Sequence, residues 1–362
     1  MSMPLVVETD AVVIGAGPVG LFQVFQLGLL GLKAHLIDVL PEVGGQCVAL
    51  YPDKPIYDVP GVPLCTGREL AQQLLTQARP FLPLDPATGH CAQIHLGQLV
   101  SQLQADAEGR FLVETDHGLR WRPRTVIVAA GAGAFMPRTL NLPALEGARH
   151  VHYHLSDEAL TSWGGQRVVI AGGGEEALST AVTLAALPTA QRPRELTLLH
   201  RRDEFQVDAA LEAQVRELLA TQQLRLVVGM PTDAVLQDGR VTALTVLGAD
   251  SVARDVPLDH LLVRQGMSPK LGPLSQWGLQ LERKQVGVSP ATFESSTPGI
   301  YAVGDINTYP GKKRLLLCGF HEATLAAHAA AAVLNPEAPQ HLLYTTTSPL
   351  LHQRLGVLQP GL

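Results

Sequence analysis

The chain has few of the features that mark disulfide-rich or nucleic-acid-binding proteins. Its 362 residues include only four cysteines, and no two of them form a Cys-x-x-Cys pair. This low usage predicts free thiols in a reducing cytoplasm rather than a disulfide framework. The formal net charge of −6 indicates no basic surface for a nucleic acid. We therefore expect a cytoplasmic protein with no nucleic-acid partner.

No stretch of the sequence predicts a membrane span or a secretory signal. The most apolar helix-length stretch, residues 21–32, contains Gln23 and Gln26 and is too short to cross a bilayer. The N-terminus leads directly into the apolar run 11–14 and lacks the pattern of a signal peptide. We expect no membrane partner.

What the chain does contain is a repeated alternation of strand, glycine turn and amphipathic helix. This alternation predicts an α/β fold of two Rossmann-like nucleotide-binding domains, each with three layers. The expected strands are 9–14, 33–38, 125–131, 167–171, 195–200 and 299–305, and the expected helices are 19–30, 175–187 and 320–334. The tail from Asn335 carries four prolines and few helix signals.

The first glycine turn has the form expected of a dinucleotide site. Gly15 permits the tight turn, Gly17 permits close approach of a pyrophosphate, and Gly20 permits close packing of helix on strand. The pyrophosphate would lie at the helix N-terminus, next to Pro18. Asp38, which follows the next strand, would accept hydrogen bonds from a ribose diol.

The second glycine turn is similar but carries acids. Gly172, Gly174 and Ala177 provide the pattern, in which alanine replaces the last glycine. Glu175 and Glu176 place two negative charges beside the expected pyrophosphate. These charges either project into solvent or weaken the site.

An arginine pair follows the second turn at the position where the first turn has its acid. Arg201 and Arg202 are suited to a 2′-phosphate, which favours NADP over NAD. The alternative interpretation is a solvated charge cluster with Asp203 and Glu204. One chain with both turns predicts a protein that holds FAD and NADP(H) together.

The order of the motifs predicts an inserted domain. We expect an FAD-binding domain from residues 1–136 and 261–362, with a C-terminal extension at 335–362, and an NADPH-binding domain at 137–260. Asp305 ends the predicted strand 299–305, beside a helix start, where it would bond the ribityl or pyrophosphate region of a flavin nucleotide.

The chain resembles the thioredoxin-reductase-like ferredoxin/flavodoxin–NADP reductases of bacteria along nearly its whole length. The resemblance is carried by the two glycine turns, the run Gly44-Gly45-Gln46, and the segments 51–61, 200–205 and 298–305. It implies a homodimer with FAD and NADPH domains, and ferredoxin or flavodoxin as the electron carrier.

The resemblance also implies roles for individual residues. Gly45 and Gln46 would lie against the flavin, and Tyr51 would stack on one face of its ring. Tyr344 would stack on the second face of the partner subunit's flavin, and Thr346 would place a hydroxyl near its reactive edge. From the residue alone ordinary packing is favoured for Tyr51, whereas within this segment we favour stacking.

The missing cysteines distinguish the chain from thioredoxin reductases. The region before the second turn reads His152 to Asp157 and lacks their Cys-x-x-Cys, so electrons would pass from flavin directly to an external carrier. One alternative is an NAD(P)H-dependent flavin reductase for quinones or a small disulfide protein. The other is a redox sensor that binds FAD and NAD(P) without turnover.

Two further patterns allow alternatives. Lys312-Lys313-Arg314 is either a docking patch for an acidic carrier or a solvated loop. His150, His152 and His154 alternate, which makes a metal site conceivable on a strand, but we expect ordinary strand packing and no metal.

Overall fold

The structure, a computed structural model, describes residues 6–106, 108–153, 162–337 and 342–357. The chain divides into two compact units. The first comprises Met1–Phe135 and Pro269–Leu362, and the second comprises Met136–Ser268. The second junction lies after Ser268 rather than after residue 260, because strand β17 (His260–Val263) pairs in parallel with the strands of the second unit.

The first unit is built on a mixed sheet with the order β5-β2-β1-β8-β7-β6, in which β21 also pairs with β8. Its strands are β1 (Val6–Ile14), β2 (Ala34–Ile37), β5 (Ile94–His95), β6 (Val100–Ala105), β7 (Phe111–Thr115), β8 (Arg120–Val128) and β21 (Ile300–Ala302). The strands β5, β2, β1, β8 and β21 run parallel, so their carboxyl ends meet at one edge. The glycine turn follows β1 at that edge.

Helices and smaller elements complete the first unit. The helices are α1 (Pro18–Leu29), α2 (Gln46–Ala49), α3 (Gly67–Ala78), α7 (Leu316–Leu334) and α8 (Pro349–Leu355), with short 3-10 turns η1 (Arg79–Phe81), η3 (Gly272–Gln276) and η4 (Gly304–Ile306). The minor strands are β3 (Pro55–Ile56), β4 (Cys65–Thr66), β19 (Leu281–Glu282), β20 (Gln285–Gly287) and β22 (Asn307–Thr308).

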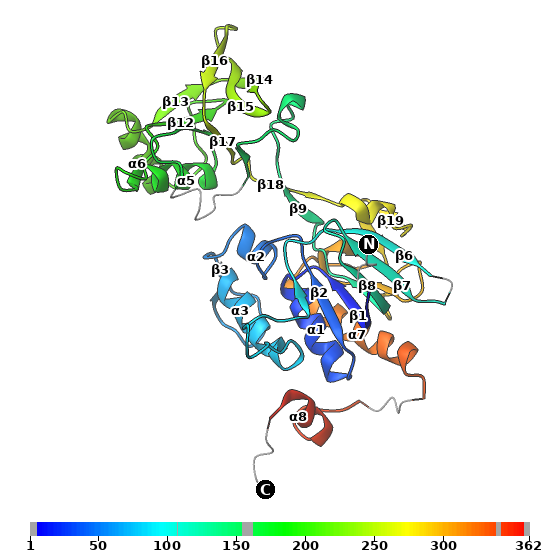
Figure 1. The fold of residues 1–362 in the computed structure, drawn as a ribbon. Coiled ribbons are helices and arrows are strands. Elements are labelled where there is room, and N and C mark those ends of the chain that lie inside the picture. Colours follow the sequence, from blue (N-terminus) through cyan, green and yellow to red (C-terminus); the bar gives the residue numbers. More distant parts are fainter. Residues whose placement is uncertain (1–5, 107, 154–161, 338–341, 358–362) are drawn as a thin grey trace. The chain divides into compact units, whose positions relative to one another are not determined.

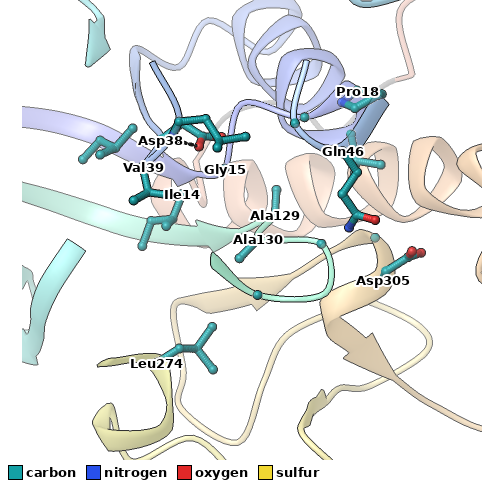
Figure 2. Close-up of a pocket in the computed structure, with 18 of the residues that line it drawn as sticks. Ile14, Gly15, Pro18, Asp38, Val39, Gln46, Ala129, Ala130, Leu274 and Asp305 are labelled. Atoms are coloured by element: carbon teal, nitrogen blue, oxygen red, sulfur yellow. Dashed lines mark hydrogen bonds between the residues drawn. The ribbon is translucent and has the colours of Figure 1, made fainter. Parts of the chain in front are cut away.

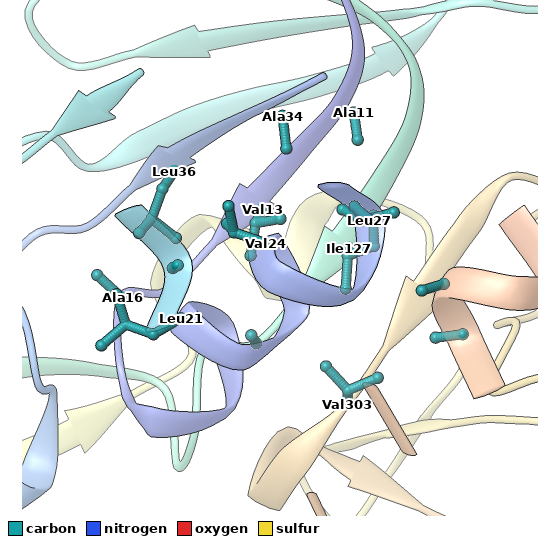
Figure 3. Close-up of a cluster of buried hydrophobic side chains, with 14 of the residues drawn as sticks. Ala11, Val13, Ala16, Leu21, Val24, Leu27, Ala34, Leu36, Ile127 and Val303 are labelled. Carbon is teal, nitrogen blue, oxygen red and sulfur yellow. The ribbon is translucent and has the colours of Figure 1, made fainter. Parts of the chain in front are cut away.

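One hydrophobic core of the first unit lies between the parallel strands and helices α1 and α7, as Figures 1 and 3 show. Val13 of β1 and Leu21 and Leu27 of α1 are fully buried there. Gly20 is required for this close packing, because a Cβ on it would lie 1.8 Å from the carbonyl oxygen of Gly15. The glycine pattern therefore determines how closely α1 approaches the turn.

The second unit repeats the plan with a five-stranded parallel sheet in the order β10-β17-β11-β12-β13, flanked by two helices (Figure 1). Its elements are β10 (Val151–His152), β11 (Arg167–Ala171), α5 (Glu175–Ala186), β12 (Glu195–His200), α6 (Ala209–Ala220), β13 (Arg225–Val228) and β17. An antiparallel sheet follows β13, with strands β14 (Met230–Gln237), β15 (Arg240–Leu247) and β16 (Ala253–Pro257). The turn η2 (Pro143–Leu145) packs on β14.

Two strands connect the units. The chain crosses from the first unit to the second through β9 (Ala134–Pro137) and returns through β18 (Met267–Lys270), and these strands pair with each other.

Two helices differ from the sequence-based expectation. Helix α7 begins at Leu316 rather than at residue 320, and α8 was not expected in the tail. Ser348 caps α8 by accepting from the N–H of Leu351 at 3.4 Å, and Gly356 ends it in a left-handed conformation. Although α7 is long and apolar enough to cross a membrane, Ala323, Ala326 and Ala327 on it are fully buried, as in a core helix.

Candidate functional site

A cleft opens at the carboxyl edge of the parallel strands in the first unit (Figure 2). The first glycine turn, Gly15 to Val19, contributes one wall. Gly17 occupies the N-cap of α1 without a side-chain cap, so N–H groups of the first helical turn are left for an anion. The expected residues Gly15, Gly17 and Pro18 line the cleft, whereas Gly20 lies behind it and sets the helix position.

Asp38 lies at one end of the cleft and braces the turn. Its carboxylate accepts from the backbone N–H of Ala16 at 2.5 Å and from that of Leu40 at 2.8 Å. Burial raises the pKa of Asp38, and these backbone donors oppose the rise by stabilising the charged form. The carboxylate thus has a structural role that the sequence pattern did not reveal, and its contact with a ribose remains a prediction.

The Gly-Gly-Gln run reaches the same cleft from the other side. Gly45 has a φ of 56°, and a Cβ on it would lie 2.9 Å from Cα of Gly17. The side chain of Gln46 extends toward Gly131, and a Cβ on Gly131 would lie 2.9 Å from Nε2 of Gln46. In Figure 2 Gln46 and Asp305 lie at the end of the cleft opposite to Asp38. Side-chain-free backbone on both walls leaves a cradle that fits an extended dinucleotide.

Tyr51 borders both the main cleft and a smaller hollow beside it. Its hydroxyl lies 3.5 Å from Sγ of the buried Cys47. Burial, together with the neighbouring thiol, raises the pKa of Tyr51 above its ordinary value, so the phenol stays protonated. Tyr51 is half-buried and its ring is available at the cleft, whereas Tyr57 is exposed in the hollow.

Asp305 lies in the turn η4, which is stabilised by hydrogen bonds to a buried carboxylate. Glu322 of α7 is 0% exposed, and its Oε2 accepts from the N–H of Gly304 at 2.7 Å. Asn307 donates to the same oxygen at 2.9 Å, and the Tyr309 hydroxyl donates to Oε1 at 2.9 Å. This network fixes the backbone that presents Asp305 to the cleft.

Lys312 completes the network and is not on a docking surface. Its ammonium lies 2.5 Å from Oε1 of Glu322 and 2.9 Å from the carbonyl oxygen of Gly304, and its side chain is 7% exposed. Of the three residues in the basic run, only Lys313 and Arg314 are exposed. Interpreting all three as a docking patch was wrong for Lys312.

The second glycine turn forms a comparable anion site in the second unit. Gly174 occupies the N-cap of α5 without a side-chain cap, and a Cβ on it would meet no atom within 4 Å. Gly172 and the fully buried Ala177 allow α5 to pack against the strands. The backbone therefore fits the pyrophosphate of a second dinucleotide.

The arginine pair is exposed at the end of β12. Among the residues that the structure describes, neither Arg201 nor Arg202 has a carboxylate partner, and Asp203 instead pairs with Arg216. Burial and the positive charges of both arginines lower the pKa of His200, which favours the neutral imidazole. The predicted charge cluster with Asp203 is thus not formed, and both guanidinium groups are accessible to a phosphate.

Glu176 has a partner that the sequence did not suggest. Its carboxylate pairs with Arg264, which follows β17. Glu175 is exposed at the start of α5. Of the two acids in the turn, one is therefore neutralised.

Tyr344 and Thr346 of the tail do not line the cleft. Tyr344 is 62% exposed, and Thr346 is also exposed, on the segment before α8. Helix α8 is held to the end of α1 by a hydrogen bond from Arg354 to the carbonyl oxygen of Leu29. The proposed contact of both residues with a partner's flavin remains a prediction.

Two of the alternating histidines, His150 and His152, pack against His260 in the second unit. The rings of His150 and His260 stack with centroids 4.7 Å apart, and Nε2 of His152 lies 3.1 Å from Nδ1 of His260. His154 lies outside the described residues. Within the described ranges, no three His, Cys, Asp or Glu side chains gather as metal ligands.

Sequence comparison decides the family. The model of the pyridine nucleotide-disulphide oxidoreductases matches residues 9–332. The chain belongs to this family. Two similar relatives of this oxidoreductase are ferredoxin–NADP reductase 2 of Cupriavidus metallidurans, 48% identical over 98% of this chain and 92% of the relative, and ferredoxin–NADP reductase of Albidiferax ferrireducens, 49% identical over 98% and 97%.

Solved structures show the same fold. The thioredoxin reductase of T. acidophilum aligns with a TM-score of 0.54 at 19% identity, covering 90% of this chain and 99% of that one. The bacillithiol disulfide reductase of Staphylococcus aureus aligns with a TM-score of 0.58 at 14% identity, covering 92% and 100%. The predicted family resemblance, the two-domain α/β fold and the assignment as an oxidoreductase are confirmed.

Sequence reasoning missed several parts of the site. Ala129, Ala130 and Gly131 line the cleft after β8, and Leu274 and Trp277 close it from the turn η3. The glycine that ends the predicted strand 125–131 was a usable signal for the first group. No local signal marks Leu274, since only the folding of the chain brings η3 to the cleft.

Proposed function

We propose that this oxidoreductase is a ferredoxin–NADP reductase that binds FAD in its first unit and NADP(H) in its second. The observation that carries the proposal is the pair of uncapped glycine turns with different continuations. The first leads to the buried Asp38, and the second leads to the exposed Arg201 and Arg202. Bound FAD would supply the redox chemistry between the hydride of NADPH and a single-electron carrier.

The residues of the chain bind and orient the cofactors. N–H groups at the start of α1 hold the FAD pyrophosphate, and Asp305 bonds the flavin nucleotide near its ribityl chain. Gln46 and Tyr51, which line the cleft, would contact the flavin ring and set its position. Arg201 and Arg202 hold the 2′-phosphate, so NADPH is preferred over NADH.

Anaerobic reduction of the purified yellow protein tests the proposal. Rapid bleaching of the flavin by NADPH, faster than by NADH, followed by cytochrome reduction that depends on ferredoxin, is the expected result. A quinone rate above the ferredoxin rate would favour a flavin reductase for another acceptor. Absence of bleaching by either nucleotide would favour a sensor without turnover.

We further propose that an acidic ferredoxin or flavodoxin docks beside the cleft. Arg314 is exposed and borders both the main cleft and the hollow with Tyr51. Arg314→Glu should weaken carrier binding and flatten its dependence on salt. Lys33→Glu is the matched control, because Lys33 is exposed at the amino end of β2, away from the cleft edge.

The homodimer also belongs to the proposal. Leu342, Leu343 and Tyr344 are exposed apolar side chains of the tail, which suits burial against a second subunit. Sedimentation of the purified protein tests this, and a monomer at micromolar concentration would contradict it. A cytoplasmic location, without nucleic acid or membrane, remains part of this proposal.

A further inference from the structure

An arginine stands against the backbone of the second glycine turn. The N–H of Arg264 donates to the carbonyl oxygen of Ala171 at 2.8 Å, so the chain after β17 continues beside β11 up to the turn. A Cβ on Gly172 would lie 2.0 Å from the carbonyl oxygen of Arg264. The two segments are therefore in direct backbone contact, and the side chain of Arg264 is 11% exposed.

The strand order places this contact at the switch point of the sheet. Strand β11 lies between β12 and β17, and the chain leaves β11 through α5 toward β12, on the side away from β17. In open parallel sheets, ligands bind at the carboxyl ends of the strands where the order reverses. Arg264 thus lies in the crevice where the nicotinamide dinucleotide is expected.

The guanidinium of Arg264 is held there by a carboxylate of the helix. It pairs with Glu176 in the first turn of α5, and its Nη1 also donates to the carbonyl oxygen of Tyr153 at 3.2 Å. Its Nε is buried, and no partner for it is found in the described part of the chain. Both contacts of the guanidinium use Nη1, so within the described residues the donors of Nη2 remain for an anion.

The two acids at the start of α5 favour a positive charge at this point. Without Arg264, the helix start would present the two carboxylates of Glu175 and Glu176 to an incoming diphosphate, which carries negative charge itself. A guanidinium attracts both a carboxylate and a phosphate, and it can bond each through different N–H groups.

We propose that Arg264 binds the diphosphate of the nicotinamide dinucleotide and neutralises Glu176, so that a turn with two acids still accepts an anionic ligand. This rests on the proposed function, since it assigns a residue to the NADP(H) site. It divides the site into two parts. Arg201 and Arg202 bind the 2′-phosphate, and Arg264 binds the diphosphate.

Calorimetric titration of the flavin-loaded protein with two probes tests the division. NADP⁺ carries both a diphosphate and a 2′-phosphate, whereas adenosine 2′-monophosphate carries only the latter. Arg264→Gln should raise the Kd of NADP⁺ about tenfold to a hundredfold and leave that of adenosine 2′-monophosphate within about threefold. Arg202→Gln is the matched control, and it should weaken both probes.

The double variant tests whether Arg264 acts partly by neutralising Glu176. In Glu176→Gln/Arg264→Gln the unpaired carboxylate is gone, so part of the lost NADP⁺ affinity should return. Arg264→Lys keeps the charge without the planar guanidinium, so its Kd for NADP⁺ should lie between those of the unaltered protein and Arg264→Gln. If Arg264→Gln fails to fold, Arg264→Lys provides the test. An unchanged NADP⁺ affinity in Arg264→Gln, or in Arg264→Lys if only that variant folds, would overturn the assignment. If the unaltered protein does not bind NADP⁺, the proposed function itself fails.

Discussion

Replacing Lys312 by methionine should destabilise the first unit strongly, although only one side chain changes. The substitution leaves the fully buried carboxylate of Glu322 without its cation. Removing one partner of a buried ion pair costs about 3–5 kcal/mol. Glu322 keeps the donors Gly304, Asn307 and Tyr309, so we expect the lower end, about 3 kcal/mol.

Urea denaturation followed by flavin fluorescence measures this effect, because the release of flavin reports on the first unit. Lys313→Met is the matched control, since Lys313 is the exposed neighbour and its loss should change stability by less than about 0.5 kcal/mol. The double variant Lys312→Met/Glu322→Gln should recover part of the loss, because no buried charge is left unpaired. A change below about 0.5 kcal/mol in Lys312→Met would refute the buried-pair argument.

Three further predictions concern the turns, the arginine pair and the histidines. Gly20→Ala should prevent folding of the first unit, because the new Cβ would collide with a carbonyl oxygen. Gly17→Ala should fold, since its Cβ would meet only one atom, at 3.9 Å, but it should bind FAD weakly. Circular dichroism and flavin content distinguish the two variants. Arg201→Gln/Arg202→Gln should reduce the preference for NADPH over NADH by about tenfold to a hundredfold in kcat/KM, and an unchanged ratio would remove the pair from the 2′-phosphate site. Burial and two neighbouring histidines lower the pKa of His260 from 6.5 to about 4. As the pH falls from 6.5 toward 4, the unfolded chain therefore binds a proton that the folded chain does not, and the free energy of unfolding should fall. The denaturation midpoints at pH 7 and pH 5 should differ less in His260→Phe than in the unaltered protein.

Local patterns predicted the turns and the strands around them. Strands β11 and β12 have the predicted bounds, since each is a short run of mostly apolar residues with the length typical of a buried parallel strand. Helix α7 was predicted from the alanine-rich run 320–334, but it begins four residues earlier, at Leu316. In the structure Gly319 is inside α7, where a Cβ would lie 2.5 Å from a methyl group of Val19, so close packing explains this glycine.

The lining of the cleft was only partly predictable. Gln46 and Asp305 were named from motifs, and both line it. Leu274 and Trp277 were missed because they belong to a turn whose own residues show no ligand-binding pattern. They reach the cleft only after the chain returns from the second unit.

The sequence by itself determined where the backbone turns, because glycine spacing and apolar runs act on neighbouring residues through backbone sterics. It also determined that the chain has an acid after one turn and arginines after the other. Only the tertiary structure decided which charges are neutralised. In the sequence Lys312 belongs to a basic run typical of a surface, but in the structure it forms a buried ion pair with Glu322. Glu176 forms an ion pair with Arg264, which lies 88 residues away in the sequence. Such pairings depend on which strand ends the fold brings together, and no local pattern encodes that distance.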